Sequence, residues 1–203
     1  DQSNAFLPGV RLVLTDSQKQ TKHEVRSDRT GRFEFVGLPS AEYQLDTELP
    51  GFANLKDKVS VNGQDVQQNI KLAVGSLTET VMVSGAGDGL PPIVRQSDKR
   101  ALPACEAPVS GGIGGQIRAP VRTRDVRPQY PKPLWDSNVA GLVTLEGTIG
   151  TTGAFRELHV ASAPHAALAA AALDAVSQWQ WDETLLNCVP VEVKITVHVN
   201  FRK

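Results

Sequence analysis

The side chains that could carry chemistry are few in this sequence and stand far apart. The four histidines lack neighbouring ligands at the spacings that metal sites use: His23, His159, His165 and His198. Four carboxylates near the C-terminal end are likewise separated, and we interpret them as solubilising: Glu146, Glu157, Asp174 and Asp182. The sequence contains no zinc-protease, serine-hydrolase or phosphate-loop motif. We therefore expect no enzymatic activity, no metal and no cofactor.

A glycine-rich run at residues 111–115 resembles a phosphate-binding loop only superficially. No predicted strand precedes the run and Pro120 soon follows it, so a dinucleotide site is disfavoured. The run belongs to residues 85–127, which carry seven Lys and Arg, four Asp and Glu, seven Gly and five Pro. We predict a solvated basic linker over residues 85–126, with a tether that touches an acidic partner as the alternative.

The two cysteines, Cys105 and Cys188, are too few and too distant for a metal cluster. In an oxidising compartment they could form a disulfide that pins the linker to the second domain. Closing a loop of about 80 residues would stabilise the fold by on the order of 4 kcal/mol. The alternative is two unrelated thiols, and the pair is therefore a disulfide candidate.

Charge and hydropathy limit the partners of the chain. A formal net charge of −1 gives no electrostatic reason to bind nucleic acid or a membrane surface. No window holds eighteen consecutive apolar residues, so no segment is suited to span a bilayer. The sequence begins at Asp1 without Met and has no signal-peptide pattern. We expect that an upstream segment, with a signal or a membrane anchor, has been removed.

Alternating apolar residues dominate the first 84 positions. In each predicted strand they recur at every second residue: Val10–Leu12–Leu14, Phe33–Phe35, Tyr43–Leu45, Val59–Val61, Ile70–Leu72 and Val81–Val83. Turn residues separate these short runs, and no helical pattern interrupts them. The pattern predicts an all-β antiparallel sandwich over residues 1–84, with Phe33, Phe35, Tyr43 and Phe52 in its core.

The run from Asp28 to Leu38 (DRTGRFEFVGL) carries the most specific motif of this domain. Together with Tyr43-Gln-Leu45 and Gly51-Phe52, it resembles the carboxypeptidase regulatory-like domain, a transthyretin-like sandwich. The resemblance implies an accessory role, as a spacer, a folding aid or a weak carbohydrate- or peptide-binding module. Ala41 stands where the family has Gly, and the family's first strand is missing, which should leave an unpaired sheet edge.

The C-terminal part of the chain combines strands with one helix. Strands are predicted over three ranges: 141–149, 155–162 and 191–201. Between the second and third strands, Leu168, Ala172, Ala175 and Trp179 recur at helical spacing behind Pro164. The order of hairpin, helix and strand predicts a small α+β two-layer domain over residues 127–203.

A tyrosine between two prolines leads into this domain at residues 128–131 (PQYP), where the prolines favour an extended backbone. This approach is followed by Gly141-x-Val143, by a helix that ends in Trp179-Gln-Trp181 and by an alternating strand that ends at Phe201. In this order, the segments resemble the C-terminal domain of TonB-family energy transducers. The sequence departs from that family in the loop that holds Asp182-Glu183 and Cys188.

The resemblance implies a partner site built from the approach segment and the final strand. Its candidate residues are Gln129, Tyr130, Pro131, Val191, Val193, Ile195, Val197 and Val199. A final strand with an open flank offers backbone N–H and C=O groups to an incoming extended peptide. The alternatives are that this strand pairs only within its own sheet or with a second copy in a homodimer.

The function that the resemblance implies is that of the periplasmic portion of a TonB-like protein. Such a protein binds the TonB box peptide of an outer-membrane TonB-dependent transporter by β-strand addition and transmits energy for uptake. A segment outside this sequence would anchor it to the inner membrane and contact inner-membrane proton-channel proteins. The alternative is a structural or sensory ectodomain of a larger membrane protein, for example a sensor-type peptidase.

Overall fold

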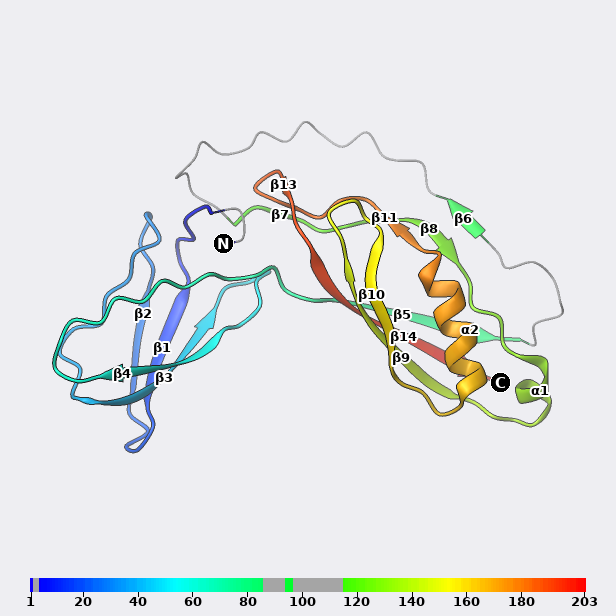
Figure 1. The fold of residues 1–203 in the computed structure, drawn as a ribbon, viewed down its shortest axis with the longest axis horizontal. Helices are drawn as coiled ribbons and strands as arrows, with labels where there is room; N and C mark the ends of the chain where they lie inside the picture. The colour runs from blue at the N-terminus through cyan, green and yellow to red at the C-terminus, as the bar shows by residue number, and fades with distance from the viewer. Residues whose placement is uncertain (2–3, 86–93, 97–114) are drawn as a thin grey trace. The chain divides into compact units, whose positions relative to one another are not determined.

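A computed structural model describes residue 1 and residues 4–85, 94–96 and 115–203 (Figure 1). The described chain falls into two compact units. The first unit contains most of the region up to residue 75, and the second contains nearly all of the region from residue 118 onward together with residues 76–85. Cys105 and the glycine-rich run up to residue 114 lie outside the described residues.

The first unit is built on one antiparallel sheet in the order β2-β1-β3-β4 (Figure 1). The strands are β1 (Arg11–Asp16), β2 (Lys22–Arg26), β3 (Ala41–Glu48) and β4 (Lys56–Val61). A short turn joins β1 to β2. The Asp16 carboxylate stabilises this turn by accepting hydrogen bonds from the N–H groups of Gln18 and Lys19. The predicted all-β character of this unit is confirmed.

One face of this sheet is the core of the first unit. Leu12, Leu14, Tyr43 and Leu45 alternate along β1 and β3, and each side chain is buried. Phe52 is buried as well, which confirms the prediction for two of the four aromatic residues.

The prediction of a core position is wrong for Phe33 and Phe35. Both side chains are only half-buried, and their rings meet edge to face with centroids 6.4 Å apart. The segment that carries them ends at Gly37, whose φ of +68° turns the chain away after a short extended run. Alternation therefore identified the face of these residues correctly but overstated their burial.

The chain that packs opposite the sheet is extended, but its described residues form no regular ladder of backbone hydrogen bonds. Phe33–Phe35 and Ile70–Leu72 were predicted as strands, but the described contacts there give only an isolated bridge, between Phe52 and Val74. The stretch before Ile70 is rich in Asn and Gln and offers few apolar side chains to pack. Leu72 is nevertheless buried, so this layer still covers the sheet.

The second unit is a four-stranded sheet with a helix on one face (Figure 1). Three of its strands are β9 (Gly141–Ile149), β10 (Phe155–Ser162) and β14 (Val193–Arg202), and the helix is α2 (Ala166–Ser177). The helix lies next to β9 and β10 and buries Leu168, Ala172, Ala175 and Val176 against them. The predicted two-layer α+β architecture is confirmed, with the predicted bounds of β9 and β10.

The fourth strand of this sheet is β5 (Leu77–Ser84), and the sheet order is β10-β9-β14-β5. The sequence pattern counted Val81 and Val83 among the strands of the first domain. The structure instead pairs the strand with β14, in parallel, within the second unit. Alternation shows that a strand has one buried face, but it does not show which sheet supplies the neighbour.

A second small sheet in this unit has the order β11-β8-β6. Its strands are β6 (Val94–Gln96), β8 (Arg122–Val126) and β11 (Gln180–Trp181). Residues 122–126 were predicted as part of a solvated linker, and this part of the prediction is wrong. The Val126 side chain is fully buried, and the Val126 carbonyl oxygen accepts a 2.8 Å hydrogen bond from Nε1 of Trp179.

The remaining elements are short. Strands β7 (Ile117–Arg118), β12 (Leu185–Leu186) and β13 (Val189–Pro190) form a small three-stranded sheet. Helix α1 (Lys132–Asp136) follows the PQYP segment, and Pro131 is its N-cap in an extended conformation. Within the described ranges, none of the helices has the length and apolarity needed to cross a bilayer.

Candidate functional site

The final strand β14 is paired along both of its edges. On one side it runs antiparallel to β9, from Val193 opposite Ile149 to Phe201 opposite Gly141. On the other side it runs parallel to β5, from Ile195 beside Leu77 to Arg202 beside Ser84. The expectation of an open flank on this strand is therefore wrong, because the chain itself occupies that flank.

The predicted partner-binding residues of this strand point into the core. Four of them alternate along β14 and are at most 3% exposed: Val193, Ile195, Val197 and Val199. Val191, which precedes the strand, is also buried. Any strand that pairs here must therefore bind through the backbone of β14, whereas these side chains hold the strand against the helix layer.

The pairing between β5 and β14 is continuous over eight residue pairs without a register shift. The inward-facing side chains of β5 are Leu77, Glu79, Val81 and Val83, and the last of these belongs to the hydrophobic core. The opposite face of β5 carries Thr78, Thr80, Met82 and Ser84, all of which are exposed. The flank of β14 thus accepts a parallel strand that has one apolar and one polar face.

Arg122 of β8 lies over the inward face of β5. Its guanidinium is 3.8 Å from the carboxylate of Glu79 and 3.9 Å from that of Asp125. The same guanidinium stacks over the Trp179 ring at 4.2 Å from the ring centroid, so an aromatic surface holds it in place. Sequence reasoning missed this contact, because Glu79 and Arg122 are distant in the chain and neither stands in a recognisable motif.

Tyr130 lies in the core rather than on the surface. Its ring makes edge-to-face contacts with Trp135 and Phe201, each with a centroid separation of 5.2 Å, and its hydroxyl donates a 2.8 Å hydrogen bond to the carbonyl oxygen of Val139. Only 1% of Tyr130 is exposed. The predicted aromatic anchor therefore exists, but it fastens the approach segment to the end of β14.

The two neighbours of Tyr130 lie closer to solvent. Gln129 is exposed and Pro131 is half-buried at the start of α1. The structure brings this segment beside the C-terminal end of β14 through the Tyr130–Phe201 contact. Of the predicted partner residues, Gln129 is the one whose side chain is exposed, and the partner role of all eight stays a prediction.

The opposite border of the sheet is irregular. Strand β10 has two register shifts in its pairing with β9, one between Arg156 and His159 and one between Val160 and Ser162. Glu157 lies in the first of them, with a φ of +55°. Because bulges distort the row of backbone groups along an edge, this border is poorly suited to accept another strand.

Cys188 is disulfide-bonded in the structure. It follows Asn187, and both residues have a positive φ, as the two central residues of a type I′ turn do. Its predicted partner Cys105 lies outside the described residues, so the Cys105–Cys188 link stays a prediction. The described residues contain no group of three His, Cys, Asp or Glu side chains that could hold a metal ion.

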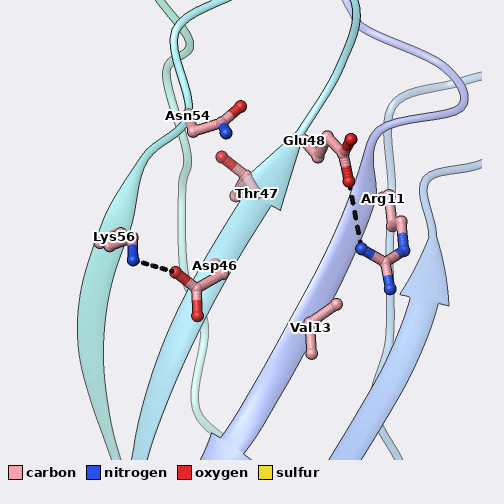
Figure 2. A pocket seen from close by; sticks show the side chains of 7 residues that line it. All are labelled: Arg11, Val13, Asp46, Thr47, Glu48, Asn54 and Lys56. Carbon is pink, nitrogen blue, oxygen red and sulfur yellow. Dashed lines mark hydrogen bonds and ion pairs between the residues drawn. The ribbon is translucent and has the colours of Figure 1, made fainter.

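The first unit has a shallow polar hollow between β1, β3 and β4 (Figure 2). Arg11 forms ion pairs with Glu24 at 2.8 Å and with Glu48 at 3.1 Å, and Lys56 forms one with Asp46 at 3.5 Å. The hydrogen bonds to Glu24 raise the pKa of Arg11 above its already high ordinary value, so this group stays charged. Because these charges neutralise one another, the hollow gives no argument for a ligand.

Comparison with known protein families gives two matches along the chain. Residues 1–73 match the carboxypeptidase regulatory-like domain, and residues 126–202 match the C-terminal domain of the Gram-negative bacterial TonB protein. Comparisons with curated proteins and with solved structures give no match. Strand β5 lies outside both matched regions, so it is an addition to the matched part of the sheet.

Proposed function

We propose that this chain, in which a carboxypeptidase regulatory-like domain precedes a TonB C-terminal domain, binds outer-membrane transporters by β-strand addition and transmits energy for uptake. TonB C-terminal domains are periplasmic domains of the Gram-negative envelope, and the family interacts with outer-membrane TonB-dependent transporters. The ligand in this proposal is the extended TonB box peptide of such a transporter. A segment outside this sequence would connect the chain to the inner membrane and to proton-channel proteins there.

The pairing of β5 with β14 is the observation that carries this proposal. Strand β5 is not part of the matched TonB region, yet it adds to the matched sheet in parallel over eight residue pairs. The backbone of β14 can therefore accept a strand from outside the domain. Main-chain hydrogen bonds supply affinity with little demand on the sequence of the bound peptide.

Strand addition also suits the transmission of force. A pull along the strand direction is shared by the hydrogen bonds of the whole ladder, so no single bond carries the load. The proposed role requires no catalytic step, and we propose that the chain is not an enzyme. It also requires that Val193, Ile195, Val197 and Val199 keep β14 straight against the core, which their burial supports.

Titration of the full chain with transporter peptides tests the proposal. The peptides copy the N-terminal segments of the outer-membrane transporters from the same cell, and the backbone amides of the isotope-labelled chain are followed by NMR. We expect shifts confined to Ile195–Arg202, Leu77–Ser84 and the segment around Gln129, and no shifts with a scrambled peptide. Silence with every peptide at millimolar concentration, for both the parent chain and a Glu79→Arg variant in which β5 loses its ion pair with Arg122, would contradict the proposal.

A further inference from the structure

We propose that β5 is an internal competitor for the flank of β14, and that an external strand binds this flank only after β5 has left it. The proposal rests on the proposed function for the identity of the external strand, a transporter peptide. The replacement of β5 by an external strand depends only on the pairing of strands in the β10-β9-β14-β5 sheet. It places a regulatory step before partner capture.

The position of β5 makes it a competitor. It covers Ile195–Arg202, which is eight of the ten residues of β14, and it leaves no gap in the ladder where another strand could pair. The other border of the sheet is distorted by the two bulges of β10. An external strand that adds to the regular border of the β9–β14 pair therefore meets β5 first.

Several features make β5 displaceable. Among the described strands it is a border strand with one neighbour, and parallel pairs are slightly less stable per residue than antiparallel ones. Of its four inward-facing side chains, Val83 is buried, whereas Leu77, Glu79 and Val81 are half-exposed. The strand ends at Ser84 and is followed by Gly85, which has a φ of +95° and no described atom within 4 Å of the position that a Cβ would take. Such an element belongs to the part of a fold that opens at low cost.

Arg122 favours one register of the strand that pairs with the flank of β14, because its guanidinium faces a carboxylate at one position of that strand. Its guanidinium is fixed over the Trp179 ring and faces Glu79, the third residue of β5. A one-residue slip of β5 would turn this carboxylate to the solvent face and Thr78 or Thr80 toward Arg122. The flank therefore favours a strand with the chemistry of β5, in which an inward-facing carboxylate precedes two inward-facing β-branched residues.

The covalent connection gives β5 an advantage over any external strand. A tethered segment competes at an effective concentration of about 1 mM when its tether is short and flexible. The apparent affinity for an external strand falls by the fraction of time for which the flank is free. A substitution that lowers the stability of the β5–β14 pairing should therefore raise the apparent affinity for an external strand by the same factor.

Binding of a peptide copy of β5 tests the exchange without a transporter. The probe is a fluorescent peptide with the sequence of residues 76–84 (SLTETVMVS), and it is titrated into the full chain and into variants. Glu79→Arg sets two cations against each other in the tethered strand, while the peptide keeps its carboxylate for Arg122. Thr80→Arg is the matched control, since it makes a similar change to arginine on the exposed face of the same strand.

We expect the Glu79→Arg chain to bind the peptide at least tenfold more tightly than the parent chain, and the Thr80→Arg chain to bind it within twofold of the parent. Val83→Asp, which places a carboxylate in the core contact of β5, should give the same gain. Amide exchange along the β9–β14 pairing reports whether the sheet persists in each variant. If the Val83→Asp chain loses its amide protection along the β9–β14 pairing, its sheet has unfolded, and the peptide affinity of the Glu79→Arg chain alone tests the exchange.

Equal affinity of the parent, Glu79→Arg and Thr80→Arg chains for the peptide would overturn the exchange. The two proposals fail in different ways. If the peptide copy binds the Glu79→Arg chain but no transporter peptide does, the exchange stands and the transporter role fails. If transporter peptides bind the parent and the Glu79→Arg chain equally well, the role stands and the exchange fails.

Discussion

The ring of Tyr130 meets the ring of Phe201 edge to face, at a centroid separation of 5.2 Å and an interplanar angle of 83°. This contact joins the proline-flanked approach segment to the last buried residue of β14. Phe201 is fully buried, and Trp135 contacts Tyr130 with the same geometry. The approach segment is thus part of the same domain as β14, whose flank pairs with β5.

Substitution of Tyr130 should affect stability in two steps. Tyr130→Phe removes the hydroxyl that donates to the Val139 carbonyl oxygen, which should cost about 1 kcal/mol in the free energy of unfolding. Tyr130→Ala also removes the ring and should cost about 3–5 kcal/mol. Urea unfolding followed by tryptophan fluorescence measures both, because all three tryptophans belong to the second unit.

If Tyr130→Phe left stability unchanged and instead weakened peptide binding, Tyr130 would be a contact residue for the partner and our assignment of its ring to the core would fail.

Trp179→Phe should destabilise the second domain by about 1–3 kcal/mol, because the buried carbonyl oxygen of Val126 loses the Nε1–H donor. Trp181→Phe is the matched comparison. The Nε1 atom of Trp181 is also buried, but it has no hydrogen-bond partner in the described part of the chain, so its loss leaves no polar group unpaired. Chemical denaturation of both variants checks the difference. Equal costs would mean that the Val126 contact contributes nothing.

The alternation of apolar residues predicted β9, β10 and β14 well, because each of these strands has one face against the helix and one toward solvent. It could not predict that β8 is packed. Arg122 and Arg124 gave residues 122–126 the appearance of a solvated linker, whereas the long side chain of Arg122 packs over the ring of Trp179. Charge indicates solvent exposure less reliably for Arg than for shorter side chains.

Gly153→Ala should be among the most costly changes in the second domain. The residue has a φ of +79°, and an added Cβ would overlap the carbonyl oxygen of Trp181. We expect a loss of at least about 3 kcal/mol, since backbone strain and steric overlap combine. Gly85→Ala, with a φ of +95° and no atom of the described residues within 4 Å of the added Cβ, should cost only about 1–2 kcal/mol from backbone strain. A cost for Gly153→Ala that is no larger than that for Gly85→Ala would contradict the geometry of this turn.

The first domain should lose stability as the pH falls below about 4, the ordinary pKa of an aspartate. Backbone hydrogen bonds from Lys19 and Gln18 lower the pKa of Asp16, and bonds from Thr30 and Arg32 lower that of Asp28. The folded state therefore binds these protons less tightly than the unfolded state. Their contribution is present above the ordinary pKa and is lost as the pH falls through the lowered one.

The double variant Asp16→Asn, Asp28→Asn keeps acceptor oxygens in both turns but removes the titration. Amide exchange at Leu12 and Leu45, measured between pH 5 and pH 3, should change less in this variant than in the parent. Asp65→Asn, at an exposed position with no side-chain hydrogen bond among the described residues, should behave like the parent. The same pH response in the parent and the double variant would rule out these two aspartates as its cause.

A chain matured in an oxidising compartment should contain a Cys105–Cys188 link. Non-reducing mass spectrometry after proteolysis should show one cross-linked peptide pair and no free thiol. Reduction should then lower the free energy of unfolding, by on the order of 4 kcal/mol in the chain-entropy model. Two free thiols in protein from such a compartment would refute the pairing.

The sheet to which strand β5 belongs could not be predicted from the sequence. Its alternation correctly indicated a strand with one apolar face, at Val81 and Val83. Whether that face belongs to the sandwich or to the following domain depends on long-range pairing with β14, which leaves no local signal. The same limitation produced the prediction of an open flank, because a pattern identifies buried faces and not neighbours within a sheet.

The most direct test of strand capture is the NMR structure of the full chain with a bound transporter peptide. We predict cross-strand contacts between α and amide protons of the peptide and those of Ile195–Arg202, in parallel register, together with the loss of the corresponding contacts from Leu77–Ser84. A complex in which β5 still pairs with β14 while the peptide lies elsewhere would contradict capture at this flank.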